Sequence, residues 1–180
     1  MGTTRLVSRR RQDSGAKWAR IAMAVLATAG LIDTGSITLK RWGLLGNLTC
    51  PMGADGCDKV LNSAWGTVFA GIPLSLVGVL AYGAVLLMAL LPLLPGLQEN
   101  KGDLSRRTWW GLFTVSLGMA VFSGVLLGVM LLKIQAFCFF CVLSAALSLA
   151  LFVLSIVGGG WDDLGQLLFR GVLLALAVLL

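Results

Sequence analysis

The sequence contains no histidine, and only 12% of its 180 residues are charged. The absence of histidine excludes imidazole as a general base, as a metal ligand and as a haem ligand. The scarcity of charge excludes an ordinary water-soluble domain, because 58% of the residues are apolar and a polar surface could not cover them all. The chemistry of this chain must therefore use other side chains, and lipid must cover much of its surface.

Several apolar runs are long enough to cross a membrane. A helix rises about 1.5 Å per residue, so about 20 apolar residues cross a hydrocarbon core of about 30 Å. We therefore predict an all-α, multi-pass membrane protein. Helices are expected at about residues 18–39, 72–91, 109–132, 137–157 and 164–180, after a basic N-terminal segment at 1–17 and with a long outer loop at 40–70.

Proline and glycine mark the ends of these expected helices. Pro73 suits a first helical turn, Pro92 ends the second helix, and the glycine run at 158–160 stops the fourth. The last helix is still apolar at Leu180, where it spans only about 25 Å. We therefore expect the natural protein to continue beyond this residue.

The net charge of +6 is better explained by membrane topology than by nucleic-acid binding, because the basic residues lie in short segments between apolar runs. Ten Lys and Arg residues lie at the start of the chain, between the second and third helices, or in the fifth helix, against four in the long loop and the turn after the third helix. The positive-inside rule then places the N-terminus in the cytosol or stroma and the long loop in a periplasm or lumen.

The four cysteines form two pairs at or near that outer face. Cys138 and Cys141 open the fourth helix, where they share a face and unpaired amide groups favour a thiolate. Depth along the helix predicts that Cys138 is the more exposed sulfur and Cys141 the deeper one. Cys50 and Cys57 lie in the long loop, where an oxidising compartment permits a disulfide. The two pairs can exchange, because exchange needs only one thiolate to reach one sulfur of the other bridge.

Small side chains continue the helix face of the second cysteine pair inward. Ser144, Ala145 and Ser148 leave room in the bundle for a flat ligand. Asp33 lies in the apolar run of the first helix, where an ionisable group is a candidate for function. It belongs either to a polar network in the active site or to the outer headgroup level.

Two alternatives to redox exchange remain open for the cysteines. Both pairs could be structural bridges, although a bridge within one helical turn closes too small a loop to stabilise the fold much. A four-cysteine zinc site fits poorly, because the six-residue gap of one pair and the helical position of the other differ from zinc-knuckle spacing. We therefore expect no metal.

The order of these motifs resembles the vitamin K epoxide reductase family, and most closely its bacterial and plant-type members. The resemblance rests on the segment from Cys50 to Cys57, the stretch 58–66, the Gly-Ile-Pro sequence at 71–73 and the later pair of Cys138 and Cys141. It implies a four-helix transmembrane bundle around a quinone, with a fifth helix that leads to a thioredoxin-like domain outside the membrane. Since that domain is missing here, we expect the donor to be supplied separately or to have been cut away.

The same resemblance implies a role for each cysteine. Cys50 takes electrons from the thioredoxin-like partner, Cys57 exchanges with Cys138, and Cys141 faces the quinone. Ser63 matches the serine that the family carries beside its shuttle loop.

Two positions depart from the animal members of the family. Leu74 and Ala145 stand where those members carry an asparagine and a tyrosine near the quinone carbonyls, so we expect reduction of a quinone rather than of an epoxide. The predicted function is that of a thiol oxidase whose acceptor is ubiquinone, plastoquinone, menaquinone or phylloquinone. The alternatives are a DsbB-like oxidase, whose two pairs occur in the reverse order, and a non-enzymatic scaffold with structural disulfides.

Overall fold

The computed structural model describes residues 2–44, 59–60, 67–68, 72–94, 101–135, 137–159 and 164–179. Its helices are α1 (Gly2–Arg41), α3 (Leu74–Leu90), α4 (Lys101–Val129), α5 (Phe139–Gly158) and α6 (Leu164–Leu179). A 3-10 turn, η3 (Leu91–Leu93), extends α3, and a π-helical turn, η5 (Met130–Ile134), extends α4. The two-residue strands β1 (Thr67–Val68) and β2 (Ile72–Pro73) pair antiparallel. The architecture confirms the predicted all-α class.

Among the described residues, four segments are long and apolar enough to cross a membrane: Gly15–Arg41, Leu74–Leu93, Gly102–Lys133 and Phe139–Gly158. Large apolar side chains on these segments remain exposed, as lipid contact requires; Leu80 is 67% exposed and Leu132 is 80% exposed. These four spans make the chain a multi-pass membrane protein. Helix α6 has 16 residues, or about 24 Å, and is shorter than a hydrocarbon core of about 30 Å.

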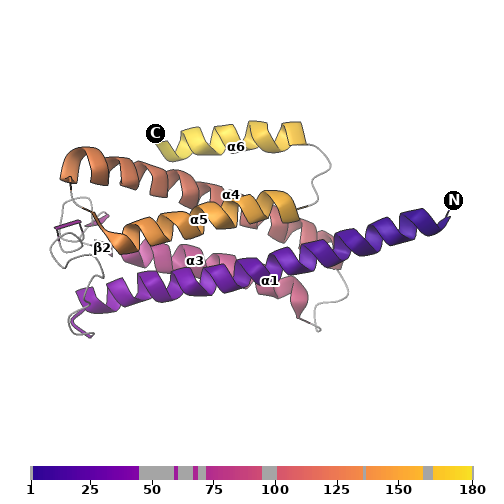
Figure 1. The fold of residues 1–180 in the computed structure, drawn as a ribbon, viewed down its shortest axis with the longest axis horizontal. Helices are drawn as coiled ribbons and strands as arrows, with labels where there is room; N and C mark the ends of the chain where they lie inside the picture. The colour runs from indigo at the N-terminus through magenta and orange to yellow at the C-terminus, as the bar shows by residue number, and fades with distance from the viewer. Residues whose placement is uncertain are drawn as a thin grey trace.

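The helices α1, α3, α4 and α5 run side by side, and α6 lies against α4 (Figure 1). Because the chain direction alternates, α1 and α4 end where α3 and α5 begin (Figure 1). We call this the cysteine end, since Cys138 stands directly before α5. The N-terminal part of α1 extends beyond the bundle at the opposite end (Figure 1).

The observed helix bounds differ from the predicted ones where polar residues continue an apolar helix. Helix α1 begins at Gly2 rather than near residue 18, because arginine, glutamine and alanine favour helix even where they are not apolar. Helix α4 begins at Lys101 rather than near residue 109, and its first turns carry an exposed ion pair of 3.1 Å between Asp103 and Arg107. Apolar length predicts the membrane span but not the whole helix.

A buried arginine joins three helices at the end opposite the cysteines. Arg20 on α1 is only 4% exposed. Its guanidinium donates hydrogen bonds to the carbonyl of Met88 (3.2 Å), to the carbonyl of Ser105 (3.1 Å) and to the hydroxyl of Thr108 (3.0 Å). It also lies 4.5 Å from the centre of the Trp109 ring. These bonds fix α1 against α3 and α4 and satisfy a charge that would otherwise be costly to bury.

Pairs of serines join α4 to α5 inside the apolar bundle. The hydroxyl of Ser116 lies 3.2 Å from that of Ser155, and Ser148 lies 3.2 Å from Ser123. Small polar side chains of this kind allow close helix contact in membranes and form hydrogen bonds between helices. They position α5, and with it the cysteine pair.

Candidate functional site at the cysteine end

Two cysteines stand together where α5 begins. Cys138 is the N-cap residue of α5, and Cys141 lies in its first turn. Their sulfur atoms are 2.8 Å apart, with the thiol of Cys141 donating to Cys138. A disulfide needs a separation of about 2.05 Å, so the sulfurs need to move only slightly to form a disulfide when the pair is oxidised.

The exposure of the two sulfurs is the opposite of the predicted order. Cys138 is 0% exposed, whereas Cys141 is only partly buried. Cys138 forms a cluster with Met130, and Val60 packs against that cluster, while Cys141 lines a cavity. The prediction that Cys138 is the more exposed sulfur was wrong, because side chains from other segments cover the start of α5.

The environment of Cys138 favours its thiolate. The hydrogen bond from the Cys141 thiol lowers the pKa of Cys138 to about 7, although burial acts in the opposite direction. The backbone N–H groups of Cys141 and Phe140 also lower this pKa, as expected at a helix N-terminus. A thiol with a lowered pKa is a better leaving group in thiol–disulfide exchange.

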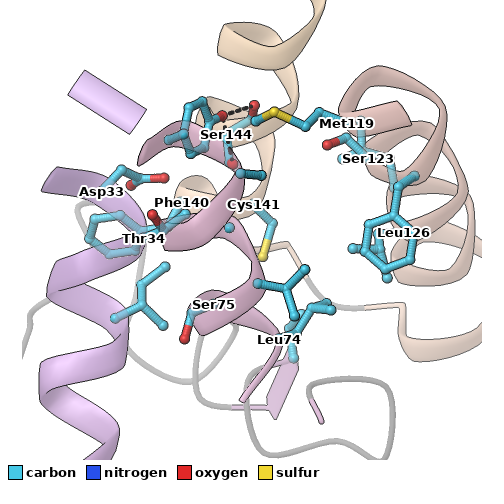
Figure 2. Close-up of a pocket in the computed structure, with 18 of the residues that line it drawn as sticks. Asp33, Thr34, Leu74, Ser75, Met119, Ser123, Leu126, Phe140, Cys141 and Ser144 are labelled. Carbon is cyan, nitrogen blue, oxygen red and sulfur yellow. Dashed lines mark hydrogen bonds between the residues drawn. The ribbon is translucent and has the colours of Figure 1, made fainter. Parts of the chain in front are cut away.

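A cavity of about 410 Å³ lies beside the cysteine pair, between α1, α3, α4 and α5 (Figure 2). Most of its lining is apolar, with a few polar groups, which is typical of a site for a small molecule. The polar or charged residues that line it are Asp33, Thr34, Lys40, Arg41, Ser75, Tyr82, Ser123, Cys141 and Ser144.

Three of the four residues predicted to hold a cofactor line this cavity, namely Leu74, Cys141 and Ser144. Ala145 is 9% exposed and is not part of the lining, and its carbonyl accepts a hydrogen bond of 2.9 Å from Ser148. The structure therefore brings Cys138 and Cys141 together with Leu74 and Ser144 at one end of the bundle. The other predicted site residues, Cys50, Cys57 and Ser63, lie outside the described residues.

Tyr82 on α3 is a lining residue that the sequence analysis did not single out. It is 1% exposed, and its hydroxyl donates to the carbonyl of Ser144 over 2.9 Å and lies 3.1 Å from the Ser144 hydroxyl. Gly30 makes room for it, since a Cβ there would collide with the Tyr82 ring. A usable signal was present, because Tyr82 is the single tyrosine of the chain and lies within an apolar run.

Asp33 also lies at this site. Its side chain lines the cavity and the residue is only 6% exposed, which favours the active-site alternative over a position at the headgroup level. Figure 2 shows its carboxyl group projecting from α1 into the space between the helices.

The fold and the site together define a class: a multi-pass helical membrane protein with a redox-capable dithiol beside an apolar cavity. The family model of vitamin K epoxide reductase matches residues 21–156, which is most of the chain. The chain belongs to the vitamin K epoxide reductase family, as the motif order predicted.

One relative carries a more specific name. The thiol-disulfide oxidoreductase LTO1 of Arabidopsis thaliana is 31% identical over 156 residues, an alignment that covers 82% of this chain. The chain spans only 39% of that relative's length.

Proposed function

We propose that the chain is a membrane thiol oxidase that passes electrons from thiols outside the membrane, through Cys50/Cys57 and then Cys138/Cys141, to a quinone. The observation that carries the proposal is the dithiol at the start of α5, whose sulfurs are 2.8 Å apart and one of which lines an apolar cavity. Membership of the family and the likeness to a thiol-disulfide oxidoreductase support it.

The cavity fits the head group of a quinone in size and in polarity. Its volume of about 410 Å³ lies within the range of about 300–1,000 Å³ usual for small-molecule sites. Leu74, Phe140 and Cys141 would hold the ring, and Ser144 lies beside them in the lining. Both carboxyl oxygens of Asp33 lack a hydrogen-bond partner among the described residues. In its protonated form this carboxyl group could donate a hydrogen bond to a quinone carbonyl. A bound quinone would accept two electrons and two protons and become a quinol.

Cys57 is the proposed nucleophile toward the disulfide of the second pair. Val60 follows it by three residues and packs against the cluster of Met130 and Cys138. Three residues of chain span at most about 11 Å, so we propose that Cys57 can reach Cys138. Attack by the Cys57 thiolate on the Cys138 sulfur forms a mixed disulfide and releases Cys141 as a thiolate. In this proposal, the loop whose Val60 packs against the Cys138 cluster also contains Cys57, the residue that attacks Cys138.

Cys50 completes the transfer by attacking Cys57. This step closes the disulfide of the shuttle pair, Cys50/Cys57, and releases Cys138, whose lowered pKa makes it a better leaving group. Two electrons have then moved from the shuttle pair to Cys138 and Cys141. When these two close their own disulfide, they give up two electrons and two protons to the acceptor. Ser63 is proposed as a polar neighbour of the shuttle pair.

The proposed electron donor is a thioredoxin-like protein on the side of the membrane that the cysteine end faces. The excess of basic residues at the N-terminus and in the first turns of α4 supports this orientation. The N-terminus then lies in the cytosol or stroma, and the cysteine end faces a periplasm or lumen, where disulfides persist.

The proposal is tested with the purified protein in liposomes, under anaerobic conditions, with reduced thioredoxin as donor and decylubiquinone as acceptor. This quinone is chosen because its fully substituted ring does not add thiols. We expect one quinol for each disulfide formed in thioredoxin, and a rate at background for Cys50→Ser/Cys57→Ser. An inert scaffold would instead give no quinol, and its bridges would resist dithiothreitol.

A further inference from the structure

Asp33 is a buried acid without a hydrogen-bond partner in the part of the chain that the structure describes. It is 6% exposed, and neither carboxyl oxygen has a hydrogen-bond partner among the described residues. More than about 90% of buried polar groups in proteins are bonded, and an ionised carboxylate without a partner is very costly in apolar surroundings. Because this carboxyl lines the cavity, a molecule bound there could supply a hydrogen-bond partner.

The neighbouring polar side chains already have partners within the protein. The Tyr82 hydroxyl bonds to Ser144, and the Thr34 hydroxyl donates to the carbonyl of Gly30 over 2.8 Å. Ser75 accepts a hydrogen bond of 2.9 Å from Thr38. None of these hydrogen bonds involves Asp33, so its carboxyl group can still bond to a molecule in the cavity.

The position of Asp33 also relates it to the reacting sulfurs. Asp33, Tyr82 and Cys141 all line the same cavity, and the sulfur of Cys138 lies 2.8 Å from that of Cys141. Since Cys141 and Asp33 both line the cavity, one from α5 and the other from α1, a flat molecule between them can face a sulfur and an acid together.

We propose that Asp33, as the carboxylic acid, donates a hydrogen bond to a carbonyl oxygen of the bound quinone and delivers that proton when Cys138 and Cys141 are oxidised. The inference rests on the proposed function and adds a proton donor to it. In the acid form the side chain presents one O–H donor, which matches a carbonyl acceptor.

The electrons and protons balance. Closing the Cys138–Cys141 disulfide releases two electrons and two protons, and reduction of a quinone to a quinol consumes two of each. Asp33 supplies one proton to the oxygen it contacts, and a thiol of the pair supplies the other. The second thiol proton leaves to water, and Asp33 regains a proton from water.

The experiment separates binding of the quinone from proton delivery. Asp33→Asn keeps a donor but cannot release a proton, whereas Asp33→Leu removes both. We expect Asp33→Asn to bind decylubiquinone within about threefold of the unaltered protein, and Asp33→Leu to bind it roughly tenfold more weakly, measured by quenching of tryptophan fluorescence. In a single turnover of the reduced protein, Asp33→Asn should reduce the quinone about 100-fold or more slowly, as loss of a general acid predicts.

Infrared difference spectroscopy gives a readout that does not depend on turnover. Adding decylubiquinone should shift the carbonyl stretch of a protonated carboxyl group, and this signal should vanish in Asp33→Asn and persist in Asp103→Asn. The latter makes the same chemical change at an exposed position, since Asp103 is 67% exposed. Asp33→Glu, which restores an acid, should recover at least about a tenth of the rate.

The outcomes distinguish this inference from the proposed function. If the unaltered protein reduces decylubiquinone, and Asp33→Asn does so at the same rate with the same infrared signal, Asp33 is not the proton donor and the proposed function survives. If the unaltered protein neither binds nor reduces the quinone, the proposed function fails, and this inference fails with it.

Discussion

Mild oxidation of the variant Cys50→Ser/Cys141→Ser should convert it to a form with a disulfide between Cys57 and Cys138. These are then the only two cysteines of the chain, and each has lost the partner that resolves a mixed disulfide. The expectation follows from Val60, which packs against the Cys138 cluster three residues after Cys57. Mass spectrometry of the digested protein identifies the bridge.

The matched variant Cys57→Ser/Cys141→Ser leaves Cys50 as the single cysteine of the shuttle loop. Cys50 is ten residues from Val60 rather than three, so its tether to Cys138 is much looser. We expect its bridge to Cys138 to form roughly tenfold more slowly, because a disulfide requires Cα atoms within about 7 Å. Equal rates in the two variants would show that Cys57 has no special access to Cys138.

Gly30→Ala should destabilise the protein by about 1–3 kcal/mol, the usual cost of overpacking a core. A Cβ at this position collides with the ring of Tyr82, which is buried between helices and must shift to make room. Displacing the ring also breaks the hydrogen bonds to Ser144 at the cavity wall. Weaker binding of decylubiquinone should therefore accompany the lower resistance to denaturant.

Gly35→Ala is the matched control for Gly30→Ala, since it lies on the same helix and its Cβ would meet nothing within 4 Å. Alanine there should be neutral or stabilising by up to about 1 kcal/mol, because glycine is the poorer helix former. Removing the ring in Tyr82→Leu should lessen the effect of Gly30→Ala in a double-mutant cycle. A similar loss of stability in both glycine variants would mean that helix contact with Tyr82 is not the cause.

Much of the fold and part of the site could be predicted from the sequence. Apolar runs of about 20 residues predict the membrane spans because lipid imposes their length. The position of Cys138 and Cys141 at the start of α5 followed from the short connection after the preceding apolar run, and the structure places them there. The cysteine order, read with the segment from Cys50 to Cys57, was specific enough to indicate the family that the comparison then confirmed.

The features that the sequence did not predict depend on contacts between distant segments. Burial of Cys138 results from Met130 and Val60, which no local pattern places above it. The bond from Tyr82 to Ser144 joins residues 62 positions apart. No local pattern marks Arg20 as a buried donor, because its partners are carbonyl and hydroxyl groups on α3 and α4, 68 to 88 positions away in the sequence.

The most direct test of the account is a single turnover of the variant Cys50→Ser/Cys57→Ser, whose remaining cysteines are Cys138 and Cys141. The protein is reduced, freed of reductant and mixed anaerobically with decylubiquinone, and quinol and free thiols are measured together. The account predicts one quinol per protein with the loss of both thiols, and no quinol once Cys141→Ser is added. Quinol formation that persists in this triple variant would contradict the claim that the Cys138/Cys141 pair reduces the quinone.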